Sequence, residues 1–100
     1  MPEGWAISQI SALELLVGAR DNRDLADIDT FLSGYLIVPL RASIGRRAHE
    51  LLKLYAKSHG LHVFDSLIAV TAMEEVLTLV TKNRRHFGRI QDLSLEIPQY

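Results

Sequence analysis

Residues 64–80 read FDSLIAVTAMEEVLTLV, and this stretch decides the fold. Asp65 opens a predicted helix that runs to about Glu75, and the small residues within it indicate tight packing. Leu77–Val80 follows as a continuous apolar run, which is typical of a strand buried on both faces. A helix that leads directly into such a strand indicates the alternation of an α/β protein.

The same alternation extends toward the start of the chain. We predict a short buried strand at residues 6–8 and a second apolar strand at residues 36–38, which Pro39 closes. Ser11 and Asp21 are predicted to cap two helices between these strands. Leu13, Leu16 and Val17 would share one face of the first helix, and Leu25, Ile28 and Leu32 would lie on one stripe of the second.

The longest predicted helix runs from about Arg41 to Ser58 and ends at Gly60. A short basic helix at residues 84–87 and an edge strand at residues 94–97 follow the central stretch. The alternation predicts a three-layer α/β domain with a mostly parallel sheet flanked by helices, and residues 1–100 would form this single domain. The core-facing residues of the long helix would be Ile44, Ala48, Leu51 and Tyr55.

Composition narrows the classes of protein to consider. A hundred residues, 48% of them hydrophobic, are enough for one core, and the net charge of −1 excludes both a polyacidic disordered segment and a histone-like basic protein. The absence of cysteine excludes a disulfide framework, a thiolate zinc site and a cysteine nucleophile, and it fits a cytoplasmic location. No stretch approaches the roughly 20 apolar residues of a membrane span, so we expect no membrane partner.

Polar residues come directly after two of the predicted strands and after the apolar approach at residues 61–64. They lie in the segment from Ser8 to Glu14, at Asp65, and in the segment from Thr81 to His86. In open parallel sheets the reactive crevice lies at the carboxyl ends of the strands. Carboxylates gathered there repel one another unless a divalent cation neutralises them, and such a cation can promote hydrolysis of a phosphodiester.

Each of these residues also has a structural interpretation. Glu14 and Ser11 match a capping box, in which Glu14 bonds back to the helix cap. Asp65 can cap its own helix and complement the helix dipole, and Asn83 favours an N-cap over a metal ligand. Capping and metal binding do not exclude one another, so the sequence leaves both roles open for Glu14 and Asp65.

The densest basic cluster lies directly after the strand at Leu77–Val80. Phosphate binding is its natural function, and a solvated basic turn is the alternative. His86 stands within this cluster, and its cationic neighbours indicate a surface or phosphate-facing group more than a metal ligand. The other histidines lack the spacing of a zinc motif and are predicted to be ordinary surface or helix-end residues. The cluster consists of Lys82, Arg84, Arg85 and Arg89.

Three segments together resemble the PIN domain of VapC-type toxins. Residues 7–20, with Glu14 before Leu-Leu-Val-Gly-Ala, are similar to the family segment in which a strand ending in serine or threonine leads to an acid and a Glu-Leu-x-x-Gly-Ala helix. Residues 64–72 resemble the family's Asp-x-Leu-Ile-Ala-x-x-Ala helix, with Asp65 as the aspartate. Residues 79–87 resemble the closing Thr-x-Asn-x-x-Asp/His-Phe motif, and residues 93–98 resemble the last strand. The order and spacing of these segments agree with the family over residues 7–98.

The resemblance implies a function and a set of residue roles. Family members are Mg²⁺- or Mn²⁺-dependent endoribonucleases of toxin–antitoxin systems, usually dimeric, and a small antitoxin protein holds them inactive. The resemblance implies that Glu14 and Asp65 are catalytic and bind the metal. It also implies that the basic cluster Lys82, Arg84, Arg85 and Arg89 holds RNA phosphates. The residues that would order the site are Ser8, Thr81, Asn83 and His86.

The sequence departs from the family pattern in two ways. His86 replaces the fourth family acid, which lowers the negative charge of the site. The family also begins with a strand that carries its first catalytic aspartate, and here six residues precede Ile7, so that strand and aspartate are missing from the segment. A misassigned start and a real truncation both fit this observation. The alternative function is therefore a catalytically incomplete PIN-like module in dimerisation or antitoxin binding, and we expect a homodimer or higher oligomer with little activity.

Overall fold

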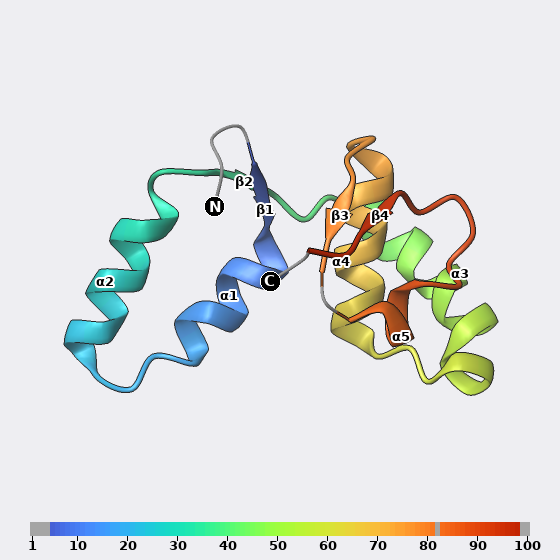
Figure 1. Ribbon diagram of the computed structural model, residues 1–100, viewed down its shortest axis with the longest axis horizontal. Helices are drawn as coiled ribbons and strands as arrows, with labels where there is room; N and C mark the ends of the chain where they lie inside the picture. Colours follow the sequence, from blue (N-terminus) through green and yellow to red (C-terminus); the bar gives the residue numbers. More distant parts are fainter. Residues whose placement is uncertain (1–4, 82, 99–100) are drawn as a thin grey trace. The chain divides into compact units, whose positions relative to one another are not determined.

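A computed structural model of the chain describes residues 5–81 and 83–98 (Figure 1). The chain folds into two compact units, which divide between Leu40 and Arg41. In the described residues of both units, every strand pair is parallel, as the sequence predicted. No helix in the described ranges is long and apolar enough to cross a membrane.

The first unit places two helices between two strands in the sequence. The strands pair in parallel with Ile7 opposite Ile37, and Ile7, Ala12 and Leu32 form the buried cluster. Asp21 caps the second helix by accepting a hydrogen bond from the Asp24 backbone N–H at 2.8 Å, which confirms the predicted cap. The elements are β1 (Ala6–Ser8), α1 (Gln9–Val17), α2 (Asn22–Leu32) and β2 (Leu36–Val38).

The start of α1 differs from the prediction. Ser8, not Ser11, is the N-cap, and its hydroxyl oxygen accepts a hydrogen bond from the Ser11 backbone N–H at 3.1 Å. The helix therefore begins at Gln9, directly after the strand, and the capping box between Ser11 and Glu14 is not formed. The chain reaches its first cap-forming hydroxyl at the last residue of β1, so Ser11 is already helical.

Of the three residues predicted to share one face of α1, only Leu16 packs against the core. Ile10 and Ala12 are the buried residues of this helix, whereas Leu13 is 45% exposed and Val17 is 86% exposed. Apolar residues occur on all sides of α1, so their spacing did not distinguish the buried side. In α2, Leu32 is buried and Ile28 packs against the core, but Leu25 is exposed.

The second unit packs two long helices against each other and adds a short parallel strand pair. Leu79 of the first strand is opposite Leu95 of the second. Residues from three helices form the core, including Ile44 and Val70, which are almost fully buried, and Phe87. The elements are α3 (Ala42–His59), α4 (Val63–Glu74), β3 (Leu79–Val80), α5 (Arg84–Phe87) and β4 (Leu95–Glu96).

The long helix α3 confirms its predicted bounds to within a residue at each end. Ile44, Ala48 and Leu51 are buried and Tyr55 packs against them, as the spacing predicted. Gly60 ends the helix with φ of 66°, a left-handed conformation that glycine adopts without strain.

Two boundaries near the central stretch differ from the prediction. The helix α4 begins at Val63 with His62 as its N-cap, so Asp65 lies in the first turn and is not the cap. The strand β3 covers only Leu79–Val80, and both residues are half-buried. The strand is shorter than predicted because the backbone at Leu77 still belongs to the end of α4: its N–H donates to Ala72 O at 2.8 Å.

Candidate functional site

Asp65 and His86 meet within the second unit. Asp65 lies in the first turn of α4 and His86 in α5, and the distance from Asp65 Oδ2 to His86 Nδ1 is 3.0 Å. Their side chains keep 19% and 26% of their surface exposed, so an ion or a substrate in solution can reach them. The carboxylate also faces the positive end of the α4 dipole, which stabilises its charge.

Asn83 and Thr81 extend this pair into a hydrogen-bonded chain. The Asn83 Oδ1 atom accepts from the His86 backbone N–H at 3.2 Å and so caps α5, as predicted. The Thr81 hydroxyl accepts from the Asn83 backbone N–H at 3.1 Å. We call Asp65, His86, Asn83 and Thr81 the Asp65 cluster, and it unites three residues predicted to order the site with one predicted metal ligand.

His86 Nδ1 has two neighbours with conflicting requirements. Asn83 Nδ2 lies 2.9 Å from it and Asp65 Oδ2 lies 3.0 Å from it. An unprotonated Nδ1 can accept a hydrogen bond from the Asn83 amide, but it then faces the Asp65 carboxylate oxygen with no proton between the two atoms. A protonated Nδ1 can donate to Asp65 but then faces the Asn83 amide donor. One of the two contacts is therefore mismatched whichever tautomer is present.

His62 also lies beside the cluster, and the sequence analysis assigned it no role there. Its ring is edge-on to the His86 ring, with a centroid separation of 5.2 Å. His62 is the N-cap of α4, three residues before Asp65. No sequence spacing indicates this contact, because His62 and His86 lie far apart in the sequence and meet only where α4 and α5 pack together.

Glu14 and Ser8 belong to the first unit. Glu14 is exposed on α1, beyond the first turn of the helix. The Ser8 hydroxyl caps α1 and donates to Ser11 Oγ at 3.0 Å, so it has a structural role of its own. Within residues 5–81 and 83–98, no three carboxylate or histidine side chains gather closely enough to hold a metal ion by themselves.

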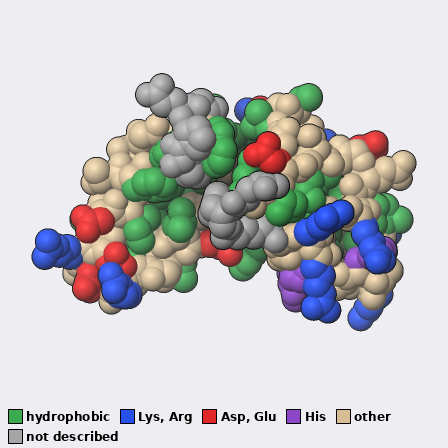
Figure 2. Space-filling model, in the orientation of Figure 1, with side chains coloured by type: hydrophobic (Ala, Val, Ile, Leu, Met, Phe, Trp, Pro, Cys, Tyr) green, Lys and Arg blue, Asp and Glu red, His purple; other side chains and the backbone are tan. Residues whose placement is uncertain are grey.

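Arg84, Arg85 and Arg89 are exposed on and just after α5. Figure 2 shows lysine, arginine and histidine side chains gathered on this side of the second unit. None of the three arginines forms an ion pair with another described residue, so their charges are available to an anion. Lys82, the fourth member of the predicted cluster, lies outside the described residues.

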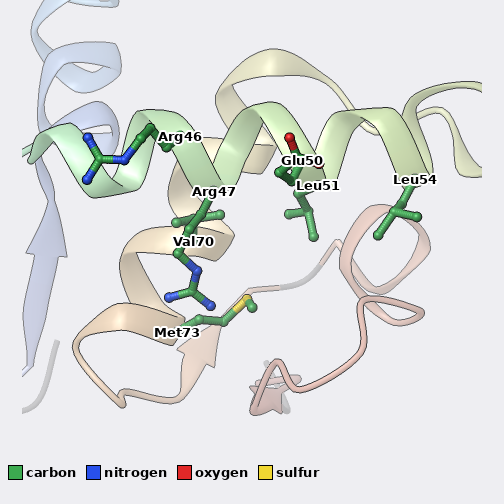
Figure 3. Close-up of a pocket in the computed structure, with 7 residues that line it drawn as sticks. All are labelled: Arg46, Arg47, Glu50, Leu51, Leu54, Val70 and Met73. Carbon is green, nitrogen blue, oxygen red and sulfur yellow. The ribbon is translucent and has the colours of Figure 1, made fainter.

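A separate groove of about 320 Å³ lies over α3 and α4 (Figure 3). Leu51, Leu54, Val70 and Met73 make most of its lining apolar. Its charged residues are Arg46, Arg47 and Glu50, and Arg47 is 3.6 Å from Glu74. The groove contains no member of the Asp65 cluster, and a single carboxylate in its lining does not favour a cation site.

Comparison with known proteins decides the family. The PIN domain family matches residues 1–93 of the chain. The chain belongs to the PIN domain family. Ribonuclease VapC19 of Mycobacterium tuberculosis is 36% identical over 92 residues, which cover 91% of this chain and 73% of that relative.

Solved structures of PIN family complexes agree with this assignment. The chain matches VapBC2 from Rickettsia felis, bound to a DNA fragment from its promoter, with a TM-score of 0.81 and 33% identity over 94% of this chain and 74% of the other. It matches DNA-bound VapBC from Salmonella typhimurium with a TM-score of 0.81 and 27% identity over 92% and 74% of the two chains. These findings confirm the predicted family and the α/β fold class.

Proposed function

We propose that this chain is a metal-dependent endoribonuclease of the toxin–antitoxin type that hydrolyses RNA phosphodiesters. The observation that carries the proposal is the Asp65 cluster, in which a carboxylate meets His86 at 3.0 Å. Arg84, Arg85 and Arg89 are exposed on and just after the same helix α5 and form no ion pair with another described residue. The relatives named ribonuclease VapC support the reaction. The family match over residues 1–93 runs through both compact units, which supports treating residues 1–100 as a single domain. A cytoplasmic location is part of the proposal.

Asp65 would bind the divalent cation through its solvent-accessible carboxylate, and Mg²⁺ or Mn²⁺ would complete its coordination with water. Glu14 is proposed as a metal ligand on its place in the family motif alone. When bound, the cation would polarise the phosphodiester and promote attack by water.

The remaining residues would position these groups. Asn83 fixes the His86 backbone, Thr81 fixes Asn83, and Ser8 fixes the start of the helix that carries Glu14. Arg84, Arg85 and Arg89, together with Lys82, would hold the RNA backbone, because arginine and lysine reach phosphates without reading the bases.

The catalytic part of the proposal is tested by RNA cleavage with Mg²⁺ or Mn²⁺ added after removal of other metals. Asp65→Asn and Glu14→Gln should abolish cleavage, and EDTA should do the same. Asp92→Asn is the matched control, because Asp92 is an exposed aspartate with φ of 68°, a conformation that asparagine tolerates. Full cleavage in EDTA or in the Asp65→Asn protein would refute the metal assignment.

The RNA-binding role is tested by salt dependence. Replacing Arg84 and Arg85 by alanine should weaken the binding of all single-stranded RNAs alike. It should also reduce the slope of log K for RNA binding against log salt concentration by about 1.4, at about 0.7 per phosphate contact. Replacing Lys53 and Lys57, which are exposed on α3, removes the same charge and should leave the slope unchanged. An unchanged slope in the Arg84 and Arg85 protein would show that the arginines form only a solvated turn.

A second function, as a module in dimerisation or antitoxin binding, is favoured by the apolar surface of the first unit. Leu13, Leu15 and Val17 on α1 and Phe31 on α2 are all exposed. Such a surface favours a protein partner, which would be a second copy or a small antitoxin. The structures from Rickettsia felis and Salmonella typhimurium are VapBC complexes, which supports an antitoxin partner for this chain.

Light scattering tests the homodimer. The wild-type chain should have the mass of a dimer or higher oligomer, and Leu13→Lys with Val17→Lys should shift it to a monomer. Leu54→Lys, at an exposed leucine of α3, is the control and should leave the mass unchanged. A wild-type monomer that cleaves RNA fully would refute the requirement for association. A dimer with no metal-dependent cleavage would favour the second function, as a module in dimerisation or antitoxin binding.

A further inference from the structure

His62 is an exposed aromatic side chain that lies beside the Asp65 cluster. It occupies the N-cap position of α4, but its side chain forms no capping hydrogen bond, so the ring itself does not stabilise the helix end. The ring packs against His86 instead, with 5.2 Å between the centroids and 69° between the planes. Two rings at such an angle meet edge to face, so His86 leaves at least one face of the His62 ring uncovered.

His86 holds the His62 ring in a defined place. His86 is itself fixed by Asp65 Oδ2, at 3.0 Å from its ring, and by the Asn83 side chain, which contacts both its backbone and its ring. A ring that is supported in this way loses little further freedom when a ligand covers its open face. A planar ligand can therefore stack on His62 at a low cost in conformational entropy.

The surface next to His62 is apolar. Val63 and Phe64 follow it in the first turn of α4, and they are 59% and 55% exposed. Apolar surface does not favour a phosphate group or a metal ion, because covering it with a charged group removes water from that charge without replacing it. The faces of nucleobases are apolar enough to suit such a surface, and they stack on aromatic side chains.

The residues that precede His86 on α5 supply positive charge. Arg84 and Arg85 are exposed, and they form no ion pair with another described residue. An RNA strand whose phosphates contact these arginines would bring its bases toward the ring that His86 supports. We infer that His62 stacks on an unpaired base of the RNA, so that the chain favours single-stranded over duplex RNA, in which the faces of the bases are already covered. This inference rests on the proposed action on RNA, and it adds a contact with a base to the contacts with phosphates.

Binding of a short oligoadenylate RNA tests the inference, and EDTA is present so that metal-dependent cleavage does not consume the RNA. His62→Ala should weaken binding about 10-fold through loss of one base stack, and His62→Phe should restore it because it keeps an aromatic face. His49→Ala is the matched control, because His49 is an exposed histidine of α3, and it should leave the affinity unchanged.

The same variants separate a base contact from a phosphate contact. Stacking releases no counterions, so His62→Ala should leave the slope of log K against log salt concentration unchanged. It should also leave unchanged the affinity for inorganic polyphosphate, which has no bases, and the affinity for duplex RNA, which has no unpaired ones. Replacing Arg84 and Arg85 by alanine should weaken the binding of all three ligands.

Proton NMR of the wild-type chain gives a readout that depends on no substitution. The ring current of a stacked adenine should move the His62 ring-proton signals upfield when oligoadenylate is added, and the His49 signals should stay in place. Polyphosphate at the same phosphate concentration should cause no such upfield shift. The spectrum of the His62→Phe protein identifies which signals belong to His62.

The outcomes separate this inference from the proposed function. An unshifted His62 signal at saturating oligoadenylate, or a His62→Phe protein that binds as weakly as His62→Ala, would overturn the stacking role. A reduced salt slope in His62→Ala would also overturn it, because His62 would then contact a phosphate. Stacking on His62 in a chain that cleaves no RNA with Mg²⁺ or Mn²⁺ would refute the proposed reaction alone, whereas cleavage without the effects at His62 would refute the inference alone.

Discussion

Asn83 should contribute more to stability than an exposed asparagine normally does. Its side chain makes two contacts with His86, from Oδ1 to the backbone N–H at 3.2 Å and from Nδ2 to Nδ1 at 2.9 Å. The first is the cap of α5, and α5 carries Phe87, which is 4% exposed in the core. Fraying of this short helix therefore exposes core surface.

We expect Asn83→Ala to lower the free energy of unfolding by about 1.5 kcal/mol. Loss of a cap accounts for about 1 kcal/mol and loss of an exposed hydrogen bond for about 0.5 kcal/mol. Asn83→Asp keeps the cap oxygen and should stay within about 0.5 kcal/mol of the wild type. Urea unfolding followed by circular dichroism measures both values.

Asn22→Ala is the control for this prediction. Asn22 is the exposed first residue of α2, where Asp21 provides the cap, so its replacement should change stability by less than about 0.5 kcal/mol. If Asn83→Ala were no more destabilising than Asn22→Ala, the two side-chain contacts with His86 would not contribute to stability. That result would contradict the claim that Asn83 orders the Asp65 cluster.

The remaining predictions concern packing and backbone geometry in the second unit. Ile44 is 0% exposed, so Ile44→Ala should cost about 3 kcal/mol and Ile44→Val about 1 kcal/mol in urea unfolding, and near-equal losses would show that the site is not closely packed. Gly60→Ala should lower stability by about 1 kcal/mol, because the φ of Gly60 is 66°. Gly45→Ala should raise stability by about 0.5 kcal/mol, because its new Cβ would have open space around it. Changes of the opposite sign would contradict the structure. Gly88→Ala should destabilise α5, because a Cβ there would lie 2.6 Å from the Arg84 carbonyl oxygen, and an unchanged melting temperature would disprove that contact.

The sequence predicted most of the elements because their signals were local. Ile44, Ala48 and Leu51 lie on one side of α3, and only that helix orientation buries all three. Gly60 and Asp21 mark helix ends through backbone and side-chain geometry that depends on neighbouring residues alone. Such features need no knowledge of the tertiary structure.

The errors occurred where local signals were ambiguous. Ser8 and Ser11 both suit an N-cap, and the choice between them depends on where β1 ends. The α1 sequence is apolar on every side, so its buried face depends on which partner packs against it. Val76 adopts φ of 54° after α4, and this turn shortens the strand that the apolar run 77–80 had predicted.

The Asp65 cluster was predicted in its members but not in its contacts. Asp65, Asn83 and His86 were singled out by their family motifs, but the opposing demands on His86 Nδ1 depend on distances that no sequence spacing gives. His62 was predicted to be a surface or helix-end residue, and it is exposed and caps α4. Its contact with His86, which was not predicted, arises because α4 and α5 pack together. Contacts between elements that are distant in sequence therefore required the structure.

Paramagnetic broadening by Mn²⁺ in a ¹H–¹⁵N NMR spectrum tests the central claim most directly, because it locates the bound cation. At substoichiometric Mn²⁺, the amide signals of Asp65 and His86 should broaden first, and Asp65→Asn should remove the effect. The helix α2 and its cap carry four competing aspartates, Asp21, Asp24, Asp27 and Asp29. Broadening centred on α2, with Asp65 and His86 unaffected, would contradict the claim that the Asp65 cluster is the metal site.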